Sequence, residues 1–122
     1  MLDKYEEKLL SNWESVYQQG LLTFWVLIAL ADSELTVSEL RDEISKLTNE
    51  TYNTSEQVLY RSLRKYYDLE LVDYSEIENP KGPKIKKYRI SDVGKKVLKK
   101  FIKRNISLFD NHKIKTLNKE GN

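Results

Sequence analysis

The chain has no cysteine, one histidine, two prolines and four glycines among its 122 residues. Without cysteine it has no disulfide framework, no thiolate ligand for zinc or an iron-sulfur cluster, and no thiol nucleophile. This composition fits the reducing cytoplasm, where we expect the protein to act. The single imidazole, His112, lies near the C-terminus, where we expect no second group to orient it, so the sequence argues against an enzyme.

Cofactor and metal sites are also not expected. The chain has no glycine-rich phosphate loop. The acidic residues Glu39, Asp42 and Glu43 fall on one exposed helix face without a convergent partner, so we interpret them as solvated.

Long hydrophobic runs are scarce. The most apolar stretch, residues 21–31, is much shorter than the roughly 20 residues that a membrane-spanning helix needs. It therefore predicts a buried core helix and no membrane contact. The residues before it are acidic and aromatic rather than basic, which argues against a secretory signal. The total length suits one domain of about 100 to 200 residues.

Charge is distributed unevenly along the chain, although the net charge is only +2. Residues 1–78 hold 7 Lys/Arg and 16 Asp/Glu, whereas residues 79–104 hold 11 Lys/Arg and the single acidic residue Asp92. An acidic body with one concentrated basic element can present one face to a polyanion. A solvated lysine face is the competing explanation, above all for the lysines after residue 94.

Hydrophobic periodicity predicts three helices in the first half of the chain. Residues 2–19 should form an amphipathic helix, and residues 21–31 a buried one. A third helix should start at Thr36 or Ser38 and run to Leu47, because Thr36 and Glu39 have the spacing of a capping box. Its expected buried stripe is Leu40, Ile44 and Leu47.

A fourth helix should start at Thr54 or Ser55 and run to Asp68. Its buried stripe should be Leu59, Leu63 and Tyr66. Tyr60, Tyr66 and Tyr67 could stack on single-stranded nucleic acid, but their helical spacing beside leucines favours core positions. The opposite face offers groups that can reach base edges and phosphates, with Lys65 at its edge: Thr54, Gln57, Arg61, Arg64 and Asp68.

Two β-prone runs follow, at residues 71–77 and 85–90. The turn formers between them predict an exposed hairpin tip that carries Lys81 and Lys84. In a last helix, residues 91–109, the apolar side chains spread over roughly 220°, against the stripe of about 100° that covers a helix's own core. The additional apolar surface predicts that a partner covers this helix. Residues 110–122 are polar and are expected to be disordered.

This order of elements, three helices, a strand, a basic turn, a strand and a helix, is typical of a winged helix-turn-helix domain. The apolar helix after Gly20, the Leu59-Tyr60-x-x-Leu63 pattern and the junction from Tyr88 to Gly94 resemble the PadR-like transcriptional regulators. Two positions depart from that family: residues 35–37 replace its usual His-Gly-Tyr, and Glu70 replaces a glycine before the wing strand.

The expected fold class is therefore mainly α with a small two- to three-stranded β wing, a winged helix-turn-helix with additional N- and C-terminal helices. Residues 20–90 should form the winged domain, and residues 1–19 and 91–109 should dimerise. The expected interface is Leu9, Trp13, Leu98, Phe101 and Ile102, and the expected contacts to double-stranded DNA are Thr54, Ser55, Gln57, Arg61, Arg64, Lys65, Lys81, Lys84 and Lys86.

The resemblance implies a homodimeric repressor that binds a specific DNA sequence. It also suggests a flat aromatic effector between Trp13 and Trp25, with ordinary packing of these rings as the competing explanation. Two other functions stay open. One is a winged-helix protein-interaction or scaffold module, whose acidic first half binds a basic partner; the other is a DNA-binding segregation or replication factor. Salt-dependent binding to duplex DNA would distinguish a regulator from a protein-interaction module. A segregation or replication factor would differ from a regulator only in the DNA site that it binds.

Overall fold

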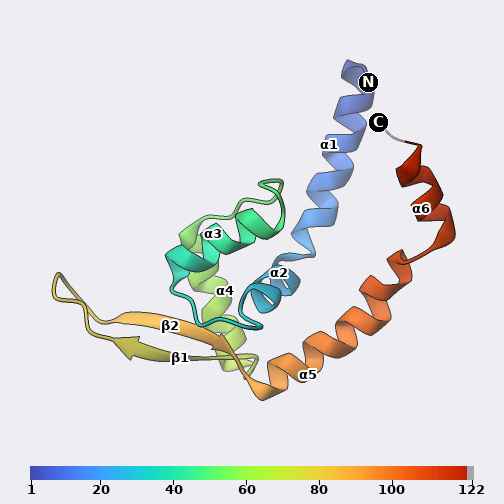
Figure 1. The fold of residues 1–122 in the computed structure, drawn as a ribbon. Helices are drawn as coiled ribbons and strands as arrows, with labels where there is room; N and C mark the ends of the chain where they lie inside the picture. Colours follow the sequence, from blue (N-terminus) through green and yellow to red (C-terminus); the bar gives the residue numbers. More distant parts are fainter. Residues whose placement is uncertain (121–122) are drawn as a thin grey trace.

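The computed structural model describes residues 1–120 as six α-helices and a two-stranded wing (Figure 1). The body of the molecule consists of α2, α3, α4, β1, β2 and α5, and two arms leave it: α1, and residues 102–120. This confirms the expected fold class. The element bounds are α1 Lys4–Gln19, α2 Leu22–Ala29, α3 Val37–Leu47, α4 Glu56–Asp68, β1 Val72–Ile77, β2 Ile85–Ile90, α5 Asp92–Phe101, the π-helical turn Ile102–Ile106, the 3-10 turn Ser107–Phe109 and α6 His112–Lys119.

Side-chain caps explain where the two helices before the wing begin. The Thr36 hydroxyl accepts the Glu39 N–H at 3.2 Å, and the Glu39 carboxylate accepts the Thr36 N–H at 2.9 Å, so the expected capping box forms. Ser55 caps α4, because its Oγ accepts the Val58 N–H at 3.1 Å. The alternative start at Thr54 is wrong, since Thr54 precedes the cap.

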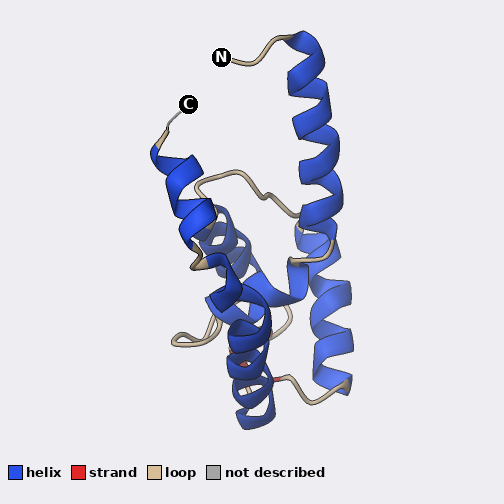
Figure 2. Ribbon diagram, turned by 90° about the vertical axis from the view of Figure 1, so that its right-hand side faces the viewer, coloured by secondary structure: helices blue, strands red, loops and turns tan. Residues whose placement is uncertain are grey.

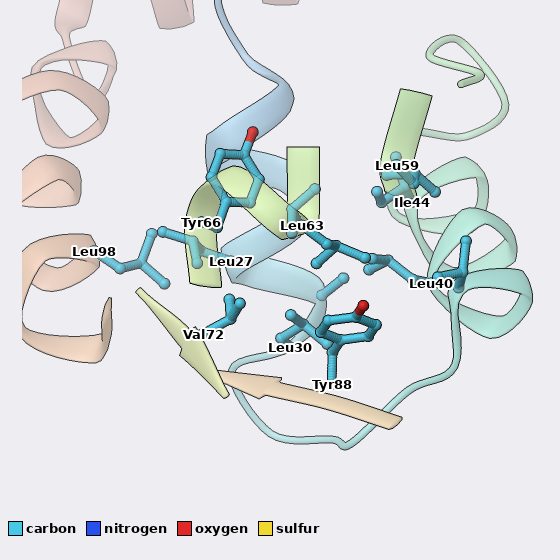
Figure 3. Close-up of a cluster of buried hydrophobic side chains, with 13 residues drawn as sticks. Leu27, Leu30, Leu40, Ile44, Leu59, Leu63, Tyr66, Val72, Tyr88 and Leu98 are labelled. Atoms are coloured by element: carbon cyan, nitrogen blue, oxygen red, sulfur yellow. The ribbon is translucent and has the colours of Figure 1, made fainter. Parts of the chain in front are cut away.

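The hydrophobic core lies between α2, α3, α4, the wing and α5 (Figure 3). Leu59, Leu63 and Tyr66 are buried, which confirms the stripe expected for α4. The Tyr66 hydroxyl lies 2.9 Å from the Thr23 hydroxyl, so its polar end is satisfied. In α3 the stripe is confirmed for Leu40 and Ile44. The predicted burial is wrong for Leu47, which lies exposed in the last turn of α3.

The wing is an antiparallel hairpin in which Val72 pairs with Ile90 and Ile77 pairs with Ile85. An isolated bridge between Leu35 and Tyr88 joins the segment before α3 to the wing. The Leu35 N–H donates to the Tyr88 carbonyl at 2.9 Å, and the Tyr88 N–H donates to the Leu35 carbonyl at 2.8 Å. The base of the wing is therefore fixed to the helical part of the body.

A left-handed residue connects α4 to the wing. Glu70 has φ of 64°, its N–H donates to the Tyr67 carbonyl at 3.0 Å, and the Leu71 N–H donates to the Tyr66 carbonyl at 2.9 Å. This pair of bonds is a Schellman motif, whose left-handed position is usually glycine. Glu70 thus adopts the backbone conformation of the glycine that it replaces.

The start of α5 packs closely against the same junction. The Ser91 Oγ donates to the Glu70 carbonyl at 2.6 Å and accepts the Gly94 N–H at 2.9 Å. A Cβ atom on Gly94 would lie only 2.1 Å from the Leu71 carbonyl oxygen. Glycine at position 94 is therefore required by the close approach of α5 to the backbone of the junction.

The two arms contrast with the body. The first, α1, has no buried residue, and both views show it extending away from the core (Figures 1 and 2). In the second arm the prediction of disorder for residues 110–122 is wrong in part, because residues 112–119 form the helix α6. Asn111 caps α6 by accepting the Lys113 N–H at 2.8 Å, a local signal that the overall polarity concealed. Residues 121 and 122 of that segment lie outside the described residues. No helix among residues 1–120 is long and apolar enough to cross a bilayer.

Candidate DNA-binding interface

A groove of about 970 Å³ runs between α4 and the wing, with the start of α3 at one end. Four cationic side chains line it: Arg61, Arg64, Lys84 and Lys86. Two carboxylates, Glu56 and Asp68, lie there too. The structure thus brings the cations of α4 together with those of the wing, which lie 20 or more positions further along the sequence.

The exposed face of α4 supplies the two arginines. Arg61 and Arg64 are exposed, and neither forms an ion pair within residues 1–120. The carboxylate of Glu56 is instead held by Arg41 of α3, at 2.8 Å. This ion pair ties α3 to the start of α4 and offsets a negative charge beside the groove. The guanidinium groups of α4 are left available for an outside partner.

The remaining expected contacts lie around this groove rather than in it. Gln57 is exposed near the start of α4, Thr54 is half-buried just before the helix, and the Ser55 hydroxyl serves as the cap. Lys65 is exposed but does not line the groove. Lys81 is exposed at the wing tip.

Lys84 is the only cation of the groove that has an ion-pair partner within the described chain. Its Nζ lies 3.7 Å from the Glu78 carboxylate, and both side chains are largely exposed. Such exposed pairs stabilise a protein by only about 0 to 1 kcal/mol. A phosphate can therefore replace Glu78 as the partner of Lys84 at little cost.

Tyrosines form the aromatic part of the groove, a position that the sequence did not predict for them. Tyr66 is buried as expected, but Tyr60 and Tyr67 are 55% and 45% exposed, so the core prediction is wrong for both. They lie at the edge of the buried stripe and face the wing instead of α2. Tyr67 contacts Tyr74 of β1 with ring centroids 5.0 Å apart, and Tyr74 contacts Tyr88 of β2 at 5.6 Å.

The environment of these rings differs with depth. Burial raises the pKa of the Tyr88 hydroxyl above its ordinary value.

The spacing of seven between Tyr60 and Tyr67, which places both on one side of a helix, was the available signal for a second aromatic face. It could be interpreted only once the position of the wing was known.

The residues expected at a dimer interface divide into two groups. Leu9 and Trp13 are exposed on α1, as an interface requires. Leu98 is 5% exposed and belongs to the core of its own chain, so it cannot contribute much area to a second subunit. Phe101 packs on Phe24 with ring centroids 5.6 Å apart, and Ile102 is half-buried against the core.

Exposed apolar side chains on the neighbouring face of α5, Val93 and Val97, are better placed than Leu98. The two tryptophans are not in ring contact within residues 1–120. Trp25 is half-buried and packs edge-on against Phe24 at 5.0 Å. Ordinary packing therefore accounts for Trp25, whereas Trp13 is largely exposed and has no packing role within residues 1–120.

A helix with an exposed cationic face, preceded by a tethered helix and flanked by a two-stranded wing, defines a winged helix-turn-helix protein. Residues 26–100 match the model of the transcriptional regulator PadR-like family, and the chain belongs to this family. That membership agrees with the expectation that the protein is not an enzyme. No curated protein matches the sequence.

Solved structures share the fold. A PadR family transcriptional regulator from Eggerthella lenta has a TM-score of 0.72 and 19% identity, covering 88% of this chain and 92% of its own. A PadR-like transcription factor from Bacteroides fragilis has a TM-score of 0.66 and 22% identity, covering 90% and 99%. Bacillus subtilis PadR in complex with operator DNA has a TM-score of 0.61 and 18% identity over 67% of this chain. The chain spans 47% of the length of the B. subtilis protein.

Proposed function

We propose that the protein is a cytoplasmic transcriptional repressor that binds a specific double-stranded DNA sequence as a homodimer. The observation that carries this proposal is the groove between α4 and the wing, where exposed Arg61 and Arg64 face the cations of β2 and the wing tip. The B. subtilis protein of the same fold was crystallised with operator DNA, which supports DNA as the partner.

In this proposal α4 is the recognition helix and enters the major groove. Gln57 and Arg61 lie in its first half, the half that contacts base edges in helix-turn-helix proteins. Arg64 and Lys65, further along, contact phosphates, as do Lys81 and Lys84 of the wing. Lys86 of β2 lies beside them in the groove. Thr54 and Ser55 lie at the start of α4, where Ser55 holds the helix end that meets the DNA.

The dimer is supported by apolar side chains that no part of the described chain covers. On α1 they form one stripe, and on α5 they lie beside the core face. A closed twofold dimer uses the same patch on both subunits, so pairing the arms of two chains covers every stripe at once. It also sets two recognition helices at a fixed spacing, near 34 to 36 Å for half-sites one turn apart.

Residues 1–19 and 91–109 are therefore the proposed dimerisation elements around the winged domain, residues 20–90. Residues 112–119 extend the second arm, because Ile114 and Leu117 of α6 are exposed as well. Trp13, exposed on α1, is the residue best placed to contact a flat aromatic effector at such an interface.

The decisive test is a fluorescence anisotropy titration of the full chain with duplex DNA from upstream of its own gene, at several salt concentrations and with nonspecific competitor. We expect the affinity for this duplex to exceed that for random DNA by at least about 10³-fold and to fall steeply with salt. Binding that is absent, or insensitive to salt, would contradict the proposal and would favour the protein-interaction module.

A further inference from the structure

Three tyrosine rings and one lysine connect the recognition helix to the wing. Tyr67 projects from α4, Tyr74 from β1 and Tyr88 from β2, and the ring of Tyr74 contacts both of the others. The Lys86 ammonium lies 4.5 Å from the centroid of the Tyr74 ring. Tyr74 is thus in contact with an α4 side chain and with two side chains of the second wing strand.

This contact stands at the boundary between the fixed and the projecting part of the wing. Directly opposite Tyr74 in the strand register, Tyr88 is buried and joined to Leu35 by two backbone hydrogen bonds. Beyond it, Ser75, Glu76 and Ile77 of β1 are all exposed. Tyr74 is the last half-buried residue of β1, and the tip projects past α3 and α4 (Figure 1).

The geometry points to Tyr74 as a positioning residue for DNA binding, in an inference that rests on the proposed function. By packing against Tyr67, its ring sets the angle of the wing relative to α4. At that angle Lys81 and Lys84 reach the phosphate backbone while Arg61 reaches base edges. Lys86 acts chiefly through the ring of Tyr74, because a cation held over a ring face is less available to a phosphate.

The physical reason is the cost of ordering. A two-stranded hairpin without contacts to the body is marginally stable and moves about its base. A tip that moves in this way loses conformational freedom when it binds a phosphate, and that loss reduces the affinity gained. The ring contacts hold the tip in its binding position before DNA arrives.

A role in stability alone predicts different behaviour. If Tyr74 only stabilised the fold, replacing it would affect thermal unfolding, and its effect on DNA binding would not depend on the lysines of the tip. If Tyr74 acts through the tip, its replacement loses importance once Lys81 and Lys84 have been removed. A double-mutant cycle measures this dependence directly.

The experiment combines Tyr74→Leu, which keeps apolar volume but removes the ring, with the pair Lys81→Ala and Lys84→Ala. Affinity is measured by anisotropy on the same operator duplex across a salt series. We expect Tyr74→Leu to weaken binding about tenfold and to flatten the slope of log affinity against log salt by up to roughly 2 units per subunit, as the lysine pair does. In the background of the lysine pair, Tyr74→Leu should cause no further loss.

The matched control is Tyr74→Phe, which retains the ring and should bind within about twofold of the wild type. Equal losses from Tyr74→Leu with and without the tip lysines would overturn the inference, as would an unchanged salt slope. Thermal unfolding verifies that each variant is folded. If Tyr74→Leu fails to fold, the same cycle is run with Lys86→Met, and an additive loss there overturns the inference. A wild-type chain that does not bind duplex DNA refutes the proposed function itself, whereas additivity in a chain that binds refutes only the role of Tyr74.

Discussion

The helices α4 and α1 carry similar patterns in the sequence but have opposite surroundings in the structure. In α4, Leu59 and Leu63 have no exposed surface. In α1, Trp13 and Val16 of the corresponding stripe are 74% and 70% exposed. Both helices are amphipathic, so periodicity identifies a face that needs to be covered. It does not say whether the cover comes from the same chain.

The same contrast separates the whole body from the arms. In the body, close backbone contacts and side-chain caps specify one packing, as at Gly94 and Ser91. In the arms, exposed apolar residues are separated by charged ones, and in the proposed dimer a second subunit covers them. Substitutions in the body should therefore affect unfolding, and substitutions in the arms should affect association.

The largest effect is expected from Gly94→Ala in the body. Its Cβ would lie 2.1 Å from the Leu71 carbonyl oxygen, which is backbone and cannot rotate away. We expect a loss of about 3 kcal/mol in the free energy of unfolding, measured by chemical denaturation. The control is Gly20→Ala at the end of α1, where the nearest atom is 3.8 Å away and φ is −86°. A similar stability for both variants would show that α5 can shift and that the junction does not specify the packing.

Trp13→Ala in the N-terminal arm should weaken dimerisation by about 2 kcal/mol or more, because aromatic residues near the centre of an interface contribute most. Sedimentation equilibrium at micromolar concentration measures the effect. Glu14→Ala, next to it on the same exposed helix, is the control and should leave the association constant nearly unchanged. A wild-type chain that sediments as a single 14.5 kDa species would refute the dimer.

Arg61→Ala should weaken binding to the specific duplex by about 1 to 3 kcal/mol and affect random DNA much less, because a bidentate contact to a base is lost. The two affinities are compared by anisotropy at one salt concentration. Lys65→Ala, on the same helix but outside the groove, should weaken binding to both duplexes similarly. Equal losses on both duplexes for Arg61→Ala would make Arg61 a phosphate contact.

Glu70→Gly should stabilise the body by about 1 kcal/mol, since a left-handed conformation is costly for any residue with a Cβ. Thermal unfolding of the variant should show a higher midpoint. Glu78→Gly, which removes a carboxylate without relieving a left-handed conformation, should give no gain. A destabilised Glu70→Gly variant would indicate that the carboxylate of Glu70 makes a favourable interaction.

The smallest effect is expected from Glu39→Gln. The Thr36 backbone N–H donates to Glu39 and holds the pKa of its carboxyl below its ordinary value. A lowered pKa in the folded state stabilises the protein above the unfolded pKa, and this contribution is lost as the pH falls through the folded value. We therefore expect a loss of a few tenths of a kcal/mol at pH 7, which disappears in unfolding experiments below about pH 4. Glu43→Gln, in the same helix but without such a hydrogen bond, should show no such dependence on pH.

Much of the fold was predictable because its determinants are local. The capping box at Thr36 and the strand pair around the basic turn follow from residues close together in the sequence. The basic side of the groove followed from the position of Arg61 and Arg64 opposite Leu59 and Leu63. These inferences needed only the period of a helix or a strand.

Most of the errors have a different cause. Tyr60 and Tyr67 lie at the edge of a stripe, where burial depends on whether the wing or α2 is the neighbour. Leu98 was assigned to a second chain although α5 packs it into its own core. The helix α6 was missed because overall polarity outweighed a single capping residue, Asn111. The errors at the tyrosines and at Leu98 therefore concern what an element packs against, which a single sequence does not state, whereas the signal for α6 was local.

The unpacked N-terminal helix also bears on how long a subunit survives. The helix α1 is exposed over most of its length and hydrogen-bonds to the body near its C-terminal end, where Gln18 donates to the Thr51 carbonyl. A helix with so few tertiary contacts opens at little free-energy cost, so its backbone is accessible to a protease for much of the time. Pairing with a second chain would remove that access, and the fraction of paired chains rises with total concentration. We therefore expect limited proteolysis to cut within residues 4–19 first and to slow as the protein concentration increases. Newly made subunits that find no partner would then be degraded first, so the supply of the proposed repressor would respond more steeply than linearly to its rate of synthesis.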